Sequence, residues 1–262
     1  MKRYERLNAI LELLAEDSKL DVDTAAPRLG VSEATIRRDL EYLAEQQLLT
    51  RTHGGAVANS TSYDLPLRFK SSRHPQEKQR IALAAAALVP AGGIIGMNGG
   101  TTSTETARAI GARSDLTPSH ADGVALTIVT NALNIAYELT VRSHIKIVVT
   151  GGVARSSSYE LAGPLATDML DQLHLDVALL GVDAVDPESG AMAHNEAEAM
   201  VNRMLADRAR QVILVADSTK LGKRAFARIR PIDRVDVLVT DDQADPELIK
   251  RFTDAGVRVI TA

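Results

Sequence analysis

Two hydrophobic patterns divide the chain. In the first 57 residues apolar side chains recur at helical spacing, which predicts amphipathic helices. From Gln76 onward, short apolar runs rich in β-branched residues alternate with helical stretches, which is typical of βαβ units around a largely parallel sheet. The pattern therefore predicts a small helical domain followed by a larger α/β domain. The stripe of the first helix consists of Leu7, Ile10, Leu11 and Leu14.

The small domain is predicted to be a winged helix-turn-helix. A second, short helical stretch lies between Asp21 and Leu29, and a third helix runs from Glu33 to Gln46 with Ser32 as its N-cap. Two short extended pieces flank the turn at 52–55 and predict a hairpin. Three short helices and a hairpin over residues 1–57 are the architecture of a DNA-binding module.

The rest of the chain is predicted to form a linker and one α/β domain. Residues 58–75 carry polar residues and proline without a sustained period and are interpreted as the linker; residues 76–262 form the domain, with an exposed loop at 113–123. Seven strands are expected, at Gly93–Met97, Ala125–Thr130, Ile145–Thr150, Val177–Val182, Val212–Ala216, Val235–Thr240 and Val257–Ile260. Helices are expected at Thr101–Ile110, Ala132–Val141, Pro164–Leu173 and Glu196–Arg208.

Composition narrows the chemistry. The 262 residues include no cysteine, which excludes disulfides, thiolate zinc sites, iron–sulfur clusters and cysteine nucleophiles. The formal net charge is −4, so any contact with DNA must come from a local basic cluster. The charged start and the lack of an apolar stretch of membrane-spanning length predict a soluble, cytoplasmic protein with no membrane partner.

The third predicted helix presents such a basic cluster. On a helical wheel Ile36, Leu40 and Leu43 share one side, whereas Thr35 and Arg38 lie opposite. A pair of arginines is more often solvated helix surface, but this pair lies in the second turn of a helix that a wing follows, which favours DNA contact. Thr35 and Arg38 are expected at base edges, Arg37 at a phosphate, and the two wing cations at phosphates or in the minor groove. The expected DNA-binding residues are Ser32, Thr35, Arg37, Arg38, Arg51 and His53.

These residues also carry a family resemblance. The segments Leu29-Gly30-Val31-Ser32, Thr35-Ile36-Arg37-Arg38-Asp39-Leu40 and Arg51-Thr52-His53-Gly54-Gly55-Ala56 resemble the N-terminal signature of DeoR-type bacterial transcriptional regulators. Pro27 departs from that pattern, because it falls inside the second helix, where proline removes a hydrogen bond. A short or bent helix is expected there, with less damage if Asp23 or Thr24 caps a later start.

A candidate ligand site lies at the ends of the predicted strands. The turn from Gly99 to Thr102 follows the first strand and opens a helix, whose backbone N–H groups can bind phosphate. It matches neither a Walker A loop nor a Rossmann fingerprint. Polar residues follow other strands, and parallel strands gather such residues at one edge of the sheet. The expected site suits a phosphorylated polyol and comprises Asn98, Gly99, Gly100, Thr101, Thr102, Asn131, Gly151, Gly152, Asp183, Glu196 and Lys220.

This region, too, resembles the DeoR family. The resemblance rests on Lys78 with Ile81-Ala82, Gly99–Thr102, Thr130–Leu133, Gly151-Gly152, Gly163, Leu180–Asp183, Glu196–Glu198, Asp217–Lys220 and Thr240-Asp241. It implies a fold related to ribose-phosphate isomerases and CoA transferases, and a sugar-phosphate effector that changes operator affinity. Asn98 departs from the aspartate common in the family.

The histidines and the two glutamates near residue 197 are the remaining candidates for a functional role. The six histidines lack metal-ligand spacing, so neither a metal nor a cofactor is expected. Glu196 is a site candidate, whereas Glu198 is assigned to a solvated helix face, since residues two apart on a helix point in different directions.

The favoured function is a homo-oligomeric repressor of a carbohydrate-related operon, because repeated half-sites need symmetric readers. The alternative is a sugar-phosphate isomerase that uses Asp183, Glu196 and Lys220 for proton transfer. An isomerase does not need the first 57 residues, so no catalytic residue is predicted. The effector, the operator, the oligomer size and the sign of regulation stay open.

Overall fold

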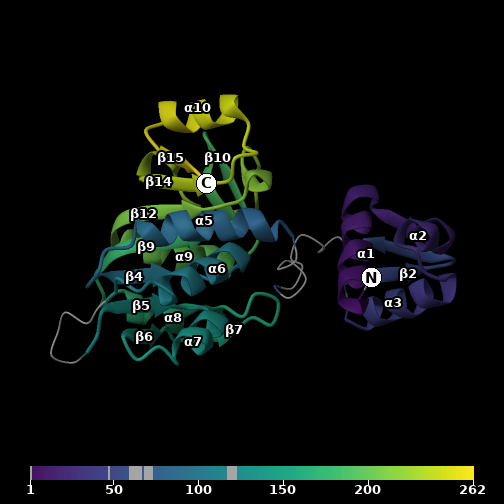
Figure 1. The fold of residues 1–262 in the computed structure, drawn as a ribbon, viewed down its shortest axis with the longest axis horizontal. Helices are drawn as coiled ribbons and strands as arrows, with labels where there is room; N and C mark the ends of the chain where they lie inside the picture. The colour runs from purple at the N-terminus through teal and green to yellow at the C-terminus, as the bar shows by residue number, and fades with distance from the viewer. Residues whose placement is uncertain (1, 47, 59–66, 68–72, 117–122) are drawn as a thin grey trace. The chain divides into compact units, whose positions relative to one another are not determined.

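The computed structural model describes residues 2–46, 48–58, 67, 73–116 and 123–262. The chain forms two compact units, Met1–Arg73 and His74–Ala262, each of which is described by itself (Figure 1). Across those described ranges, no helix is both long enough and apolar enough to cross a membrane.

The N-terminal unit is the predicted winged helix-turn-helix. Helices α1 (Arg3–Asp17), α2 (Val22–Leu29) and α3 (Glu33–Glu45) pack around one apolar core. Strands β2 (Leu49–Thr52) and β3 (Gly55–Ala58) form the antiparallel hairpin of the wing. A third strand, β1 (Lys19–Asp21), pairs with β3 and was not predicted, because three residues are too few to show a period. Gly55 is required at this pairing, since a side chain there would collide with the backbone oxygen of Leu20.

Pro27 lies in the second turn of α2, so the later start that would have placed it in the first turn is not found. The helix begins at Val22 after Asp21, so neither Asp23 nor Thr24 caps it. The predicted shortness is confirmed, because α2 has only eight residues and ends at Gly30, whose φ of 64° lies in the left-handed region. Proline is tolerated here because few turns of helix remain to be disrupted.

The predicted linker, 58–75, falls largely on residues outside the described ranges. At its two ends, β3 includes Ala58 and α5 begins at Pro75. Helix α5 (Pro75–Ala87) was not predicted from the sequence. Its alanine-rich core side packs on the sheet through residues such as Ile81, Ala82 and Ala85.

All seven predicted strands are present and form one sheet of seven parallel strands. Their order is β15-β14-β12-β9-β4-β5-β6, with every neighbouring pair parallel. The bounds are β4 (Ile94–Met97), β5 (Leu126–Thr130), β6 (Ile145–Val149), β9 (Leu175–Gly181), β12 (Ala209–Val215), β14 (Val237–Thr240) and β15 (Arg258–Thr261). The α/β fold expected for residues 76–262 is therefore confirmed.

Helices cover both faces of this sheet (Figure 1). On one face α5 packs with α6 (Thr101–Gly111) and α7 (Leu133–Leu139). On the other face lie α8 (Pro164–Leu170), α9 (Glu196–Asp207) and α10 (Pro246–Asp254), the last of which was not predicted. Alternate strand residues separate the two cores, as Val177 and Leu179 face one and Ala178 and Leu180 the other.

Smaller elements surround the carboxyl edge of the sheet. Strands β7 (Val153–Ala154) and β8 (Leu161–Ala162) form a short antiparallel hairpin. Strands β10 (Ala184–Asp186), β11 (Gly190–Ala193) and β13 (Ala227–Arg230) form a separate antiparallel sheet. The 3-10 helices are η2 (Ser218–Lys220) and η3 (Ile232–Arg234). None of these was predicted, because such short pieces are fixed by tertiary contacts rather than by periodicity.

The loop predicted at 113–123 is only partly exposed in its described residues. Leu116 is buried, and the Arg113 side chain donates to the backbone oxygens of Ala86 and Val89 at 2.7 Å each. Residues 117–122 of this prediction lie outside the described ranges.

Candidate functional site

Helix α3 exposes the cations that the sequence assigned to DNA. Ser32 caps the helix by accepting a hydrogen bond from the Thr35 amide, and its Oγ lies 2.9 Å from Thr35 Oγ1. Ile36, Leu40 and Leu43 are fully buried, as the wheel predicted. Burial of that stripe leaves the side of α3 that carries Arg38 facing outward.

The two arginines differ in their surroundings. Arg37 Nη2 lies 2.7 Å from Glu33 Oε2, in an exposed ion pair one turn apart. Arg38 is exposed, and within the described parts of the chain its guanidinium has no partner. Arg38 is therefore the arginine of the pair that is left uncommitted for an external ligand.

The two residues of the wing that were predicted to contact DNA have different surroundings. His53 is exposed in the two-residue turn between β2 and β3. Arg51 instead donates to the backbone oxygen of Gly55 at 2.5 Å, and its Nε lies 3.6 Å from Glu41 Oε2 on α3. Its guanidinium thus ties the wing to the helix.

An ion pair beneath α3 was missed by the sequence analysis. Asp39 is 3% exposed and accepts from Arg6 of α1, at 2.5 Å from Nε and 3.3 Å from Nη2. The bond to Asp39 raises the pKa of Arg6. Tyr42 is half-buried, with the Arg3 guanidinium 4.6 Å from its ring centroid. In the segment Arg37-Arg38-Asp39, the two arginines are exposed and the aspartate is buried. Asp39 connects α3 to α1 and so holds the helix that carries the arginines.

At the carboxyl edge of the large sheet, the Asn98 side chain connects the ends of β4 and β9 by hydrogen bonds. Its Oδ1 accepts from the Gly181 amide at 2.8 Å and from Ser103 Oγ at 3.2 Å, and its Nδ2 donates to the Gly181 oxygen at 2.9 Å. Asn98 is buried at the end of β4, beside the end of β9. The amide uses both its donor and its acceptor function here, which an aspartate could not do.

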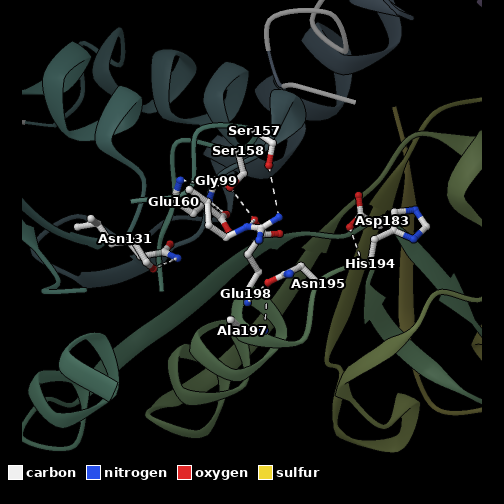
Figure 2. A network of polar contacts seen from close by, with 12 residues as sticks. Gly99, Asn131, Ser157, Ser158, Glu160, Asp183, His194, Asn195, Ala197 and Glu198 are labelled. Atoms are coloured by element: carbon white, nitrogen blue, oxygen red, sulfur yellow. Dashed lines mark hydrogen bonds and ion pairs between the residues drawn. The ribbon is translucent and has the colours of Figure 1, made fainter. Parts of the chain in front are cut away.

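The glycine turn after Asn98 meets a buried carboxyl group. The Gly99 amide donates a hydrogen bond to Oε1 of Glu160, which directly precedes β8 and is 3% exposed (Figure 2). A Cβ at position 99 would lie 2.6 Å from the Glu160 side chain, so glycine leaves the room that this carboxyl fills. Gly100, with φ of 115°, then opens α6 at Thr101, and Thr102 is buried in its first turn.

Glu160 is a site residue that the sequence analysis did not identify. Burial is the main cause that raises its pKa, to about 8, and the nearby charges of Glu198 and Asp183 add to the effect. The Gly99 amide and the Arg155 cation oppose it. The residue before it, Tyr159, has a φ of 61°, which is unusual for a bulky side chain and typical of constrained functional loops. No motif marks Glu160, because its environment comes from four separate segments.

The prediction that Glu198 lies on a solvated helix face was wrong. Glu198 is 7% exposed, and its Oε1 accepts from Arg155 Nε at 2.8 Å and from Ser158 Oγ at 2.6 Å. Glu196 is the exposed member of the pair. Asn195 caps α9 by accepting hydrogen bonds from the amides of Ala197 and Glu198, and the Glu198 side chain lies in the polar network (Figure 2).

Two other predicted site residues lie beside the polar contacts of Glu160 and Glu198. Asn131 is fully buried at the end of β5 and donates from Nδ2 to the Leu161 oxygen at 3.1 Å. Its Oδ1 is buried and has no hydrogen-bond partner among the residues that the structure describes. Asp183 Oδ2 accepts from the His194 amide at 2.9 Å. Both side chains flank Glu160 and Glu198 in Figure 2.

The remaining predicted residues have different surroundings. Gly151 and Gly152 follow β6, where added side chains would lie 2.8 Å from the backbone oxygens of Leu165 and Ala162. These glycines therefore allow close backbone packing. Lys220 ends η2 after β12 with a half-buried side chain. Among the described residues, no group of three or more His, Asp or Glu is placed to hold a metal ion.

Two family profiles match this chain. The DeoR-like helix-turn-helix domain matches residues 6–62, and the DeoR C terminal sensor domain matches residues 73–242. Together they reproduce the order of the two units.

Full-length relatives agree with these profiles. The Glycerol-3-phosphate regulon repressor of Escherichia coli is 32% identical over 259 residues, which cover 99% of each chain. The HTH-type transcriptional regulator GlpR of Haloferax volcanii is 33% identical, over 98% of this chain and 96% of its own. Ribose 5-phosphate isomerase A of Methanocaldococcus jannaschii superposes with a TM-score of 0.39 at 18% identity, over 55% of this chain and 52% of that one. The last value is too low to support a conclusion about activity.

Proposed function

Since this chain belongs to the DeoR family of transcriptional regulators, we propose that it represses a carbohydrate-related operon and releases operator DNA when a phosphorylated sugar binds its sensor domain. The observation that carries the DNA-binding half is the exposed face of α3, on which Arg38 has no partner among the described residues. The isomerase alternative is rejected, because relatives that match the full length are regulators rather than enzymes. This function places the chain in the cytoplasm, with the DNA.

The proposal includes a homo-oligomer. A winged helix-turn-helix reads one half-site, and two copies related by a two-fold axis read a palindrome. Binding of two copies per operator, measured by analytical ultracentrifugation of the complex, is the expected stoichiometry.

Arg38→Ala is expected to lower the discrimination between operator and random DNA by about 1 to 3 kcal/mol, because an exposed arginine in the second turn of α3 can hold a base edge. Arg37→Ala is the matched control. Arg37 is assigned to a phosphate, which is the same in every sequence, so its loss should weaken binding to both DNAs alike. Competition binding at two salt concentrations measures both effects. Equal loss on the two DNAs for Arg38→Ala would remove it from the reading role.

The ligand half of the proposal places the phosphorylated sugar at the carboxyl edge of the parallel sheet. There the Gly99–Thr102 turn offers backbone amides at the start of α6, and Asn131 offers a buried oxygen without a partner among the described residues. A thermal-shift screen of phosphorylated sugars identifies the effector, because a ligand of the folded state stabilises it by RT ln(1 + [L]/Kd).

Lys220→Ala is expected to weaken effector binding while operator affinity without effector stays within a few-fold of normal. The ammonium group suits a phosphate, and it belongs to the sensor unit rather than to the reading helix. The matched control is Lys223→Ala, which removes an exposed lysine three residues away. Operator titration with and without effector, together with the melting temperature, reads the result. An unchanged effector response, or a loss of folding that precedes any change in response, defeats this assignment.

A further inference from the structure

The Glu160 carboxyl group lies at the glycine turn where an anionic ligand is expected to bind. Its carboxyl group accepts the hydrogen bond of the Gly99 amide, at the turn that opens α6. The first amides of a helix attract negative charge, and here a side chain of the same protein satisfies one of them. The close approach is built in, because any side chain at position 99 would collide with Glu160.

Two neighbouring carboxyl groups oppose the ionisation of Glu160. They belong to Glu198 on α9 and Asp183 after β9, and both raise the pKa of Glu160, whereas the Arg155 cation lowers it. Arg155 also binds Glu198, at 2.8 Å between Nε and Oε1. Ionisation of the buried Glu160 would therefore add a further negative charge beside those two groups. A phosphate dianion added to that site would meet strong repulsion.

A second observation points to a ligand in the same place. Asn131 Oδ1 is fully buried and without a partner among the described residues, and Asn131 contacts Leu161, the residue after Glu160. A buried acceptor that is left unpaired is costly unless something donates to it. Hydroxyl groups of a polyol are such donors.

We propose that Glu160 determines when the sensor domain accepts a phosphorylated ligand: its ionised carboxylate repels the phosphate from the Gly99–Thr102 turn, whereas its neutral carboxyl group allows a phosphate to bind there. This inference rests on the proposed function, in that it assumes a phosphorylated effector at this edge of the sheet. A neutral carboxyl no longer repels the phosphate and can donate a hydrogen bond to it. Glu160 thus acts as a specificity-determining residue for the charge of the ligand.

The consequence is a pH dependence of ligand affinity. Burial, together with Glu198 and Asp183, raises the pKa of Glu160 to about 8. At pH 7 the group is mostly neutral, and at pH 9 only about a tenth of the molecules remain neutral. A phosphate monoester has its second pKa near ~6, so it is a dianion over this whole range. Phosphate affinity should therefore fall about tenfold between pH 7 and pH 9.

Calorimetric titration of the full-length protein tests the inference with three probes: inorganic phosphate, glycerol 3-phosphate and uncharged glycerol. Wild type should lose about tenfold in affinity for the two phosphates between pH 7 and pH 9, with no such change for glycerol. Glu160→Gln keeps the shape of a neutral carboxyl group and should bind the phosphates with less than twofold change. Glu247→Gln removes an exposed carboxylate elsewhere and should behave as wild type.

Each result has one meaning. Equal pH dependence in wild type and Glu160→Gln overturns the role of Glu160 but leaves the phosphorylated effector in place. Failure of both phosphates to bind either protein overturns the inference, and failure of a phosphorylated-sugar panel to change operator binding overturns the proposed function as well. The wild-type titration needs no substitution, so it decides the pH dependence even if the variant folds poorly.

Discussion

Asp39→Asn is expected to destabilise the N-terminal unit by about 1.5 to 3 kcal/mol and to weaken operator binding. The substitution removes the carboxylate of a part-buried ion pair and leaves the Arg6 side chain, 12% exposed, without its charged partner. A unit of this size has a total stability of about 5 kcal/mol, so a large share of it would be lost. Faster hydrogen exchange in peptides from α1 and α3, with the sensor domain unchanged, is the expected readout.

The matched control for Asp39→Asn is Glu33→Ala. Glu33 pairs with Arg37 on the same helix, but both side chains are more than half exposed. Exposed pairs contribute about 0 to 1 kcal/mol, so exchange in α1 should hardly change. Similar exchange rates for the two variants would mean that the Arg6–Asp39 pair does not anchor the recognition helix.

Glu160→Gln is expected to stabilise the sensor domain at alkaline pH by a few kcal/mol. In the folded protein the pKa of Glu160 is raised to about 8 from an ordinary value of 4.5. The unfolded chain therefore ionises first, and the stability linked to this group is complete below pH 4.5 and is lost as pH rises through 8. Each unit of pKa difference corresponds to about 1 kcal/mol.

Urea denaturation between pH 5 and pH 9 measures this effect. The difference in unfolding free energy between Glu160→Gln and wild type should be small at pH 5 and grow towards pH 9. Glu247→Gln provides the baseline, because an exposed carboxylate carries no burial cost. A difference between Glu160→Gln and wild type that does not change with pH would show that the carboxyl group is not desolvated in the folded state.

The parts of the fold that follow a period could be predicted from the sequence. Inner strands such as β9 and β14 are short apolar runs buried on both faces, and the stripe of Ile36, Leu40 and Leu43 fixes which side of α3 faces outward. Strand β1 and the small antiparallel sheet could not be predicted, because their pairing is set by partners distant in sequence. The helical stretch expected between Asp21 and Leu29 is present as α2, and Pro27 does not shift its start.

The candidate site likewise has residues that the sequence identifies and residues that only the structure reveals. Gly99 and Gly100 stand out in the sequence because a glycine turn before a helix has a recognisable chemistry. Glu160 and Glu198 do not, because their roles come from burial and from each other's charge. A rule about helix faces separated Glu196 from Glu198 correctly, yet the inward one could be identified only from its partners Arg155 and Ser158 in a distant segment.

Operator affinity in the presence and absence of effector tests the central claim most directly. The operator is taken as the DNA that the purified full-length protein selects from a random library, and binding is followed by fluorescence anisotropy at pH 7. A phosphorylated sugar that raises the melting temperature should weaken operator binding by about 5- to 150-fold, the usual range of allosteric coupling. Its dephosphorylated form should have no effect. Equal operator affinity with and without every phosphorylated sugar that binds would contradict the account.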